Sequence, residues 1–155
     1  MFSRPWHKHY DYNVSPTIRY PQIPVTELLQ IPANALPDKP AIYYQGMQIT
    51  FREYREMVLR MANALAGIGV RKGDRVGIQL PNCPQYLIAY YAALTLGAIV
   101  VNLNPAYTCE ELTAICSNTG LQTLFVLEEK TDVIQSLCSQ VSISRIIRTH
   151  PGQID

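Results

Sequence analysis

The chain has 155 residues, which is long enough for one domain with a substantial buried core. Hydrophobic residues make up 48% of it and charged residues 16%, a balance that excludes intrinsic disorder. Thirteen Lys and Arg against twelve Asp and Glu give a net charge of +1, and the lack of a basic run argues against nucleic acid as a partner.

The four cysteines do not form a C-x-x-C pair; they are Cys83, Cys109, Cys116 and Cys138. Scattered thiols are typical of a reducing compartment, and the first ten residues lack the apolar stretch of a secretory signal. We therefore expect a cytoplasmic protein, with peripheral contact at a membrane left open. Cys109 and Cys116 would share a helix face, and His7 and His9 lie close together, but neither pair has the further ligands that a metal site needs.

A long uncharged segment raises the question of a membrane span. No charged residue occurs between Val76 and Cys109, and the sixteen residues Tyr86–Val101 are largely apolar. A membrane-spanning helix needs about 20 apolar residues. Gly97 interrupts the stretch, and no Lys or Arg closely flanks it. We expect a helix followed by a buried strand and no transmembrane segment; a small membrane-associated protein is the alternative.

The first 24 residues are rich in Pro, Tyr and His and show neither helical nor strand periodicity. Their prolines disfavour regular structure. We divide the chain into an extended N-terminal arm, residues 1–24, and an α/β subdomain, residues 25–155. Two placements of the arm stay open: it lies on the domain, held by Trp6 and the tyrosines, or it crosses to a second subunit.

Residues 25–36 have the apolar spacing of a helix, which Pro32 is expected to kink. Residues 41–45 and 48–50 flank Gly46-Met47 and predict a short hairpin. Thr50 and Glu53 have the spacing of a capping box that opens a helix. The apolar stripe of that helix is Tyr54, Met57, Val58, Met61, Ala62 and Leu65. Gly69 is expected in the left-handed conformation just past its end.

Strands and helices alternate through the rest of the chain. The predicted strands are 75–80, 98–101, 122–127 and 143–149, and the predicted helices are 84–96, 109–117 and 131–139. A second capping box, Thr108 with Glu111, opens the middle helix. Each interval between strands holds a helix, as parallel neighbours require, and the uniformly apolar strands indicate that both sheet faces are covered. The predicted fold class is α/β: an open, mostly parallel sheet with helices on both faces, preceded by the arm and the short hairpin.

Three asparagines, Asn82, Asn102 and Asn104, fall at the carboxyl ends of predicted strands, where such sheets bind ligands. We interpret them as turn formers rather than ligand contacts, because Asn bonds its own backbone in tight turns. The run RKGD at 71–74 is interpreted as a polar turn, and Gly67 and Gly69 follow a helix rather than a strand, so neither is a phosphate loop.

No known catalytic spacing occurs, and His150 has no evident partner. No catalytic, cofactor-binding or metal-ligating residue is assigned.

Five segments between Thr50 and Leu112 follow one another in a specific order and spacing. They are Thr50-Phe51-x-x-Tyr54, Gly69-Val70-x-x-Gly73-Asp74-Arg75-Val76, Leu80-Pro81-Asn82-Cys83-Pro84, Gly97-Ala98-x-Val100-Val101-Asn102 and Asn104-Pro105-x-Tyr107-Thr108-x-Glu110-Glu111-Leu112. Together they resemble the N-terminal region of AMP-forming acyl-CoA synthetases, of the adenylate-forming superfamily. The last segment and Arg4-Pro5-Trp6 point to its long-chain fatty-acid CoA ligase branch.

The resemblance implies a parent enzyme that uses ATP and magnesium to convert a fatty acid to an acyl-adenylate, and then transfers the acyl group to coenzyme A. The family's phosphate loop and C-terminal domain have no counterpart in these 155 residues. We therefore expect an incomplete part of a larger fold: the scaffold of such a ligase, inactive and without cofactors of its own. Its partner would be the remainder of the parent chain. A free-standing, non-catalytic interaction module is the alternative.

An incomplete sheet leaves an edge strand unpaired, which invites pairing with another chain. We expect the isolated piece to self-associate as a homo-oligomer.

Overall fold

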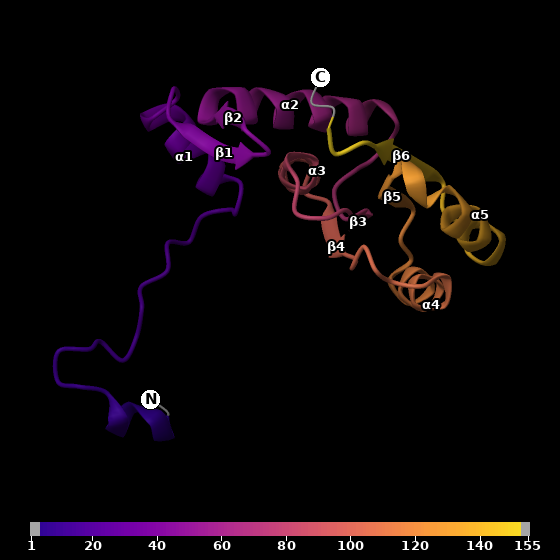
Figure 1. Ribbon diagram of the computed structural model, residues 1–155. Coiled ribbons are helices and arrows are strands. Elements are labelled where there is room, and N and C mark those ends of the chain that lie inside the picture. Colours follow the sequence, from indigo (N-terminus) through magenta and orange to yellow (C-terminus); the bar gives the residue numbers. More distant parts are fainter. Residues whose placement is uncertain (1–3, 153–155) are drawn as a thin grey trace.

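The computed structural model describes residues 4–152 (Figure 1). In chain order its elements are η1 (Pro5–His9), α1 (Glu27–Ala35), β1 (Pro40–Tyr44), β2 (Met47–Thr50), α2 (Phe51–Gly67), β3 (Arg75–Gln79), α3 (Pro84–Thr95), β4 (Ile99–Asn102), α4 (Cys109–Thr119), β5 (Thr123–Leu127), η2 (Glu128–Lys130), α5 (Thr131–Gln140) and β6 (Arg145–Thr149). The η elements are short 3₁₀-helices.

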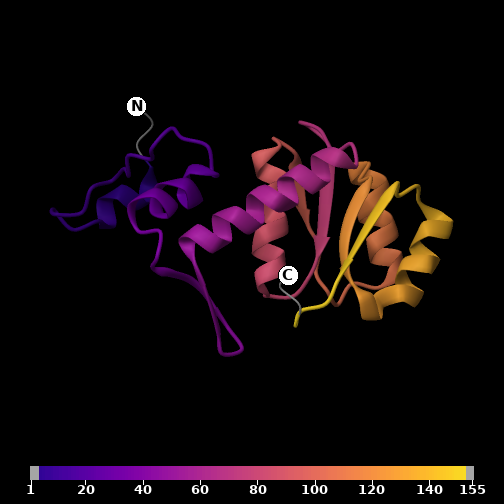
Figure 2. The same cartoon turned by 90° about the horizontal axis from the view of Figure 1, so that it is seen from above.

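The main sheet has the strand order β4-β3-β5-β6, and all its neighbours are parallel. Helices α2 and α3 pack on one face and α4 and α5 on the other (Figures 1 and 2). The predicted α/β class, an open parallel sheet with helices on both faces, is confirmed. The hairpin β1–β2 forms a separate two-stranded antiparallel sheet.

The strands differ in how far the helices cover them. Every residue of β5 is buried, as the prediction of two covered faces requires. In β4, by contrast, Ile99 is 50% exposed and Val100 and Val101 are only partly buried. The expectation of full coverage is wrong for β4, because it is an edge strand with a neighbour on one side only.

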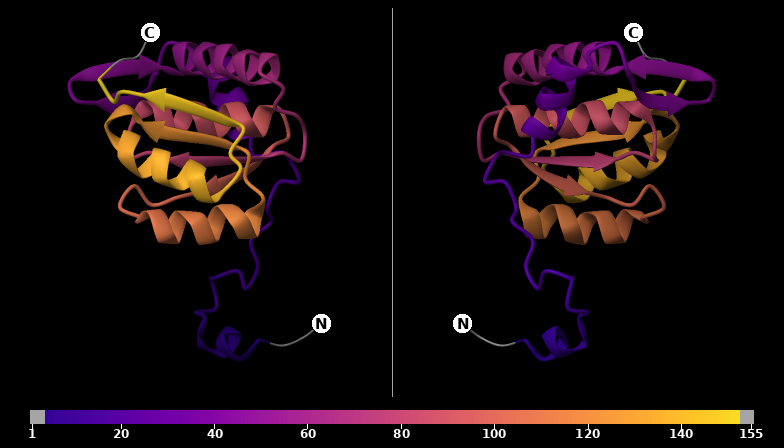
Figure 3. Two further views of the ribbon diagram at one scale, coloured as in Figure 1. Left: turned by 90° about the vertical axis from the view of Figure 1, so that its right-hand side faces the viewer. Right: turned by 90° about the vertical axis from the view of Figure 1, so that its left-hand side faces the viewer.

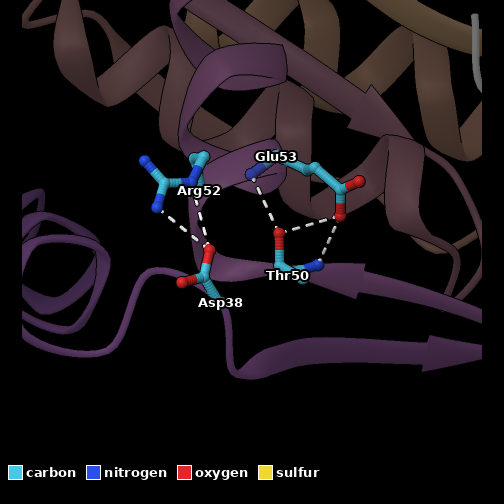
Figure 4. Close-up of polar contacts among 4 residues, drawn as sticks. All are labelled: Asp38, Thr50, Arg52 and Glu53. Carbon is cyan, nitrogen blue, oxygen red and sulfur yellow. Dashed lines mark hydrogen bonds and ion pairs between the residues drawn. The ribbon is translucent and has the colours of Figure 1, made fainter.

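Both predicted capping boxes are present. The Thr50 hydroxyl accepts a hydrogen bond from the Glu53 N–H at 3.3 Å, and the Thr50 N–H donates to the Glu53 carboxylate at 2.8 Å (Figure 4). Thr108 and Glu111 repeat the arrangement at the start of α4. Beside the first box, the Arg52 guanidinium lies 3.0 Å from the Asp38 carboxylate. The two capping boxes satisfy backbone N–H groups that the first turn of each helix leaves without partners.

The end of α2 is held by a residue far along the chain. Gly69 is left-handed, with φ +88°, as predicted. Arg145, at the start of β6, donates from Nε to the Ile68 carbonyl at 2.7 Å and from its terminal nitrogen to the Gly69 carbonyl at 3.4 Å. A cation at this position also complements the negative end of the helix dipole. Arg145 therefore fastens the last strand to the end of α2.

Helix α1 continues past Pro32 to Ala35, and the Leu36 N–H donates to the Pro32 carbonyl at 2.8 Å. In the hairpin, the two turn residues are Gln45 (φ 46°) and Gly46 (φ 83°), one position before the predicted pair. Two successive positive φ angles are typical of type I′ turns, whose twist suits a hairpin.

The uncharged segment is divided as predicted. Helix α3 has only 12 residues, Gly97 follows it with φ +71°, and β4 comes next. From residue 4 to residue 152, no helix has the length and apolar character to cross a bilayer.

The N-terminal arm runs away from the body of the molecule (Figures 1 and 3). None of the residues from 4 to 24 is buried. The interpretation that the arm lies on the domain is therefore wrong. From residue 4 to residue 24 the only regular element is η1, which Pro5 opens; the first helical position tolerates proline because its N–H has no partner in the helix.

Candidate functional site

The topology creates a switch point at the carboxyl edge of the sheet. Strands β3 and β5 are neighbours, but β3 leads into α3 on one face and β5 into α5 on the other. Connections that leave in opposite directions open a crevice beyond the strand ends, where open α/β sheets bind ligands. The carboxyl edge between β3 and β5 is therefore the candidate site of this fold.

Two of the three predicted asparagines shape the local structure. Asn104 accepts a hydrogen bond at Oδ1 from the Ala106 N–H at 2.9 Å, which is an Asx turn. Asn102 accepts one at Oδ1 from the Tyr86 hydroxyl at 3.0 Å and so ties β4 to α3. Asn82 is exposed in the loop between β3 and α3. The turn interpretation holds for Asn104.

Gln79 is a polar group that sequence reasoning missed. It ends β3 and is only 1% exposed. Its Nε2 donates to the Asn104 carbonyl at 3.4 Å, whereas no group in the described part of the chain donates to its Oε1. A buried amide oxygen without a donor is unusual. The available signal was a polar side chain, Gln79, between the apolar residues Ile78 and Leu80 of the predicted strand.

The polar run at 71–74 lies at the opposite edge, just before β3 begins. The Arg71 N–H donates to the Asp74 carboxylate at 2.9 Å, and the Gly73 N–H donates to the Gly97 carbonyl at 3.0 Å. These two backbone donors are therefore committed within the protein. The predicted polar turn is confirmed, and it is remote from the switch point.

An apolar groove of about 370 Å³ lies between α2, α3 and the strands β5 and β6. Its walls include Met57, Met61, Ile88, Phe125 and Ile147, with Arg60 and Arg148 among its polar groups. At its rim, Gln85 Nε2 donates to the carbonyls of His150 and Pro151, at 3.1 and 3.2 Å. The chain therefore leaves β6 beside this groove.

The cysteines and histidines do not form a reactive cluster. Cys83 and Cys116 are buried, and burial raises the pKa of both thiols, which makes them poor nucleophiles at neutral pH. Cys109 and Cys116 both lie on α4, as the spacing predicted. His150 accepts a hydrogen bond from the Gly152 N–H at 3.1 Å.

The acidic side chains in the described part of the chain do not form a magnesium site. Glu53 and Glu111 are used in capping boxes, Asp38 faces Arg52, and Asp74 closes its own turn. Between residues 4 and 152, no three His, Cys, Asp or Glu side chains are grouped as a metal ion would require. The residues present do not fit this ion, and no catalytic step can be derived through it.

Comparison with known proteins identifies relatives over nearly the whole chain. A Long-chain-fatty-acid--CoA ligase of Bacillus subtilis (strain 168) is 39% identical over 109 residues, covering 70% of this chain and 20% of the relative. The protein of the same name from Yersinia pestis is 32% identical over 151 residues, covering 95% of this chain and 26% of the relative. The chain thus spans about a fifth to a quarter of the length of these relatives.

Solved structures share the fold. A long-chain-fatty-acid-CoA ligase from Archaeoglobus fulgidus superposes with a TM-score of 0.78 at 24% identity, covering 86% of this chain and 29% of the other. A Mycobacterium tuberculosis fatty acyl CoA synthetase gives 0.76 at 23% identity, covering 83% and 27%.

The sequence profile described as AMP-binding enzyme matches residues 29–152, which include the whole sheet and its helices. The predicted resemblance is therefore confirmed: this chain belongs to the AMP-binding enzyme family.

Proposed function

We propose that this chain is the N-terminal scaffold of a long-chain fatty-acid CoA ligase. The observation that carries the proposal is the 32% identity to the Yersinia pestis ligase over 151 residues, because it extends through both the arm region and the sheet. The parent enzyme would activate a fatty acid with ATP to an acyl-adenylate, release pyrophosphate and transfer the acyl group to coenzyme A. It would work in the cytoplasm, with peripheral contact at membranes.

In this proposal the partner of the chain is the remainder of the parent polypeptide. The groove between α2 and β6 supports this assignment, because it is apolar and the chain leaves the sheet at its rim. The hairpin supports it as well, because its two strands pair only with each other. The parent would cover these surfaces, with residues 1–24 as an arm and residues 25–155 as the first part of its large domain.

The chain alone would be inactive. At the carboxyl edge Asn104 closes a turn and Asn102 ties β4 to α3, and the residues from 4 to 152 do not group three His, Cys, Asp or Glu side chains. ATP, magnesium and coenzyme A would therefore be bound through segments that the parent supplies. The scaffold would contribute the sheet edge against which those segments fold.

The test is ATP–pyrophosphate exchange with fatty acids of several chain lengths. We expect exchange from the protein translated from the complete gene and none from the 155-residue chain. Exchange by the short chain would contradict its role as an inactive scaffold. A complete gene product without exchange would contradict the ligase assignment and favour the non-catalytic interaction module.

Self-association is a separate part of the proposal. No strand within residues 4–152 pairs with the outer edge of β4, and its Ile99 side chain is half exposed. Exposed edges of this kind pair with other chains. We expect the isolated chain to form dimers or larger species in light scattering, and an Ile99→Lys variant to shift them toward monomer. A wild-type monomer at tens of micromolar would contradict this expectation.

A further inference from the structure

The arm carries large aromatic side chains that no part of the body covers. Trp6 is 50% exposed and Tyr20 is 78% exposed, and Tyr12 is completely open to solvent. At the tip, the Arg4 guanidinium lies over the Trp6 ring, 5.5 Å from its centroid. The arm bends around a concavity of about 930 Å³ lined by aromatic, aliphatic and cationic side chains, including Arg4, Trp6, Tyr10, Ile18 and Tyr20. Such exposed aromatic surface needs a partner.

The charge of the arm differs from that of the body. Residues 1–24 contain three cations, Arg4, Lys8 and Arg19, and one anion, Asp11, whereas the other residues contain ten cations and eleven anions. The arm therefore has a net charge of +2 and the body −1. Its partner should be anionic and should also accept aromatic rings.

The groove of a second copy does not meet this requirement. Its charged lining residues are Arg60 and Arg148, which would repel the cations of the arm. Trp and Tyr side chains favour the headgroup region of a bilayer, where the ring is partly buried and its polar atom stays wet. Lys and Arg beside them are attracted to anionic lipids.

We propose that the arm, residues 4–24, docks the protein on an anionic phospholipid surface, with Trp6, Tyr12 and Tyr20 in the headgroup layer. The proposal rests on the proposed function only for the peripheral location of the parent. The arm binds the lipid surface through its own side chains and uses no part of the sheet. The α/β body would then lie outside the bilayer, and the carboxyl edge of its sheet would not contact the lipid.

The chain reports on this contact directly, because Trp6 is its only tryptophan. The 155-residue chain is titrated with vesicles of phosphatidylcholine alone and with vesicles that also contain phosphatidylglycerol. With the anionic vesicles, we expect the Trp6 emission to shift to shorter wavelength and to gain protection from a soluble quencher. High salt should reverse both effects, since it screens the attraction to the headgroups.

Two charge variants separate the arm from the body. The triple variant Arg4→Gln/Lys8→Gln/Arg19→Gln should bind anionic vesicles much more weakly, by roughly fivefold for each cation removed. The matched control Arg60→Gln/Arg71→Gln/Arg148→Gln removes three exposed cations from the body and should bind like wild type. Tyr12→Ser/Tyr20→Ser should weaken binding, whereas Tyr43→Ser, on the exposed side of the hairpin, should not.

None of the arm residues belongs to the core, so these variants should fold normally, which circular dichroism checks. Equal binding by both triple variants, or vesicle binding without a change in Trp6 emission, would overturn the proposal. A blue shift that grows with protein concentration in the absence of vesicles would indicate a second copy as the partner instead. Pyrophosphate exchange by the complete gene product does not enter this measurement, so the two proposals fail separately.

Discussion

The helices bury the two faces of the sheet to different extents. On the α4/α5 face, Leu112, Leu124 and Leu137 are completely buried, and Gly77 lets Leu121 approach the middle of β3 closely. On the α2/α3 face, the helices cover β3 and β5, but over β6 they leave the groove in which Ile147 is only half buried. One layer of the fold is thus complete within the chain, whereas the other still offers apolar surface to a further segment.

The largest expected difference in stability is between truncating a buried leucine of the α4/α5 face and truncating an isoleucine of the groove. Leu124→Ala removes a side chain with no exposed surface and should lower the free energy of unfolding by about 2–5 kcal/mol. Ile147→Ala removes a half-buried side chain and should cost about 1 kcal/mol. Urea unfolding of the 155-residue chain measures both values. Equal losses would mean that the groove is as closed as the opposite face.

Overpacking tests the completeness of the α4/α5 face. In Gly77→Ala the new Cβ would lie 2.6 Å from the Leu121 Cδ1 and 3.1 Å from the Leu103 Cδ1, so both leucines must move. We expect a loss of about 1–3 kcal/mol in the free energy of unfolding. Gly67→Ala is the matched control, because no atom lies within 4 Å of its new Cβ, and it should leave stability unchanged or slightly raised. A neutral Gly77→Ala would show that this face has spare volume.

The hydrogen bond from Arg145 of β6 to the end of α2 lies on the incompletely covered α2/α3 face. Arg145→Gln removes the guanidinium that bonds the Ile68 carbonyl, and the expected loss is about 1 kcal/mol because the contact is partly open to water. Arg148→Gln, in the same strand but pointing to solvent, should unfold at the wild-type urea concentration. If both variants behave alike, Arg145 does not hold the helix end.

The smallest effect is a dependence on pH. Hydrogen bonds from the Thr50 backbone N–H and hydroxyl lower the pKa of Glu53 below its usual value. A lowered pKa in the folded state stabilises the protein above the ordinary carboxyl pKa, and this contribution is lost as the pH falls through the lowered value. Urea midpoints measured from pH 7 down to pH 3 should therefore fall less for Glu53→Gln than for wild type. Glu56→Gln, which makes no capping contact, should keep the wild-type slope.

Local patterns predicted the elements of this fold well, because helices, caps and strands depend on neighbouring residues. The boxes at Thr50 and Thr108 and the left-handed Gly69 are examples. Contacts between distant residues left no such pattern. The bond from Arg145 to Ile68 spans 77 positions, and neither residue is unusual for its own element.

The features nearest the candidate site were also hidden from the sequence. The groove depends on how far α2 and α3 extend over β6, which periodicity does not report. The burial of Gln79 depends on β3 lying in the middle of the sheet, and the sequence of a single strand does not predict its place in the strand order. Of the two placements that the sequence left open, the arm lying on the domain is wrong: aromatic residues usually find a surface to cover, and here the body does not provide one.

The order of the strands has a consequence for synthesis on the ribosome. Strand β3 is the first strand of the main sheet to be made, but it acquires its second neighbour only when β5 has emerged, since Val76 pairs with Thr123. The carbonyl of Ile68 at the end of α2 receives its hydrogen bond later still, when Arg145 has been made. Such non-local pairings form slowly and leave apolar strands uncovered in the meantime. Until β5 has emerged, the nascent chain must therefore carry α2, α3 and two incompletely paired strands, β3 and β4.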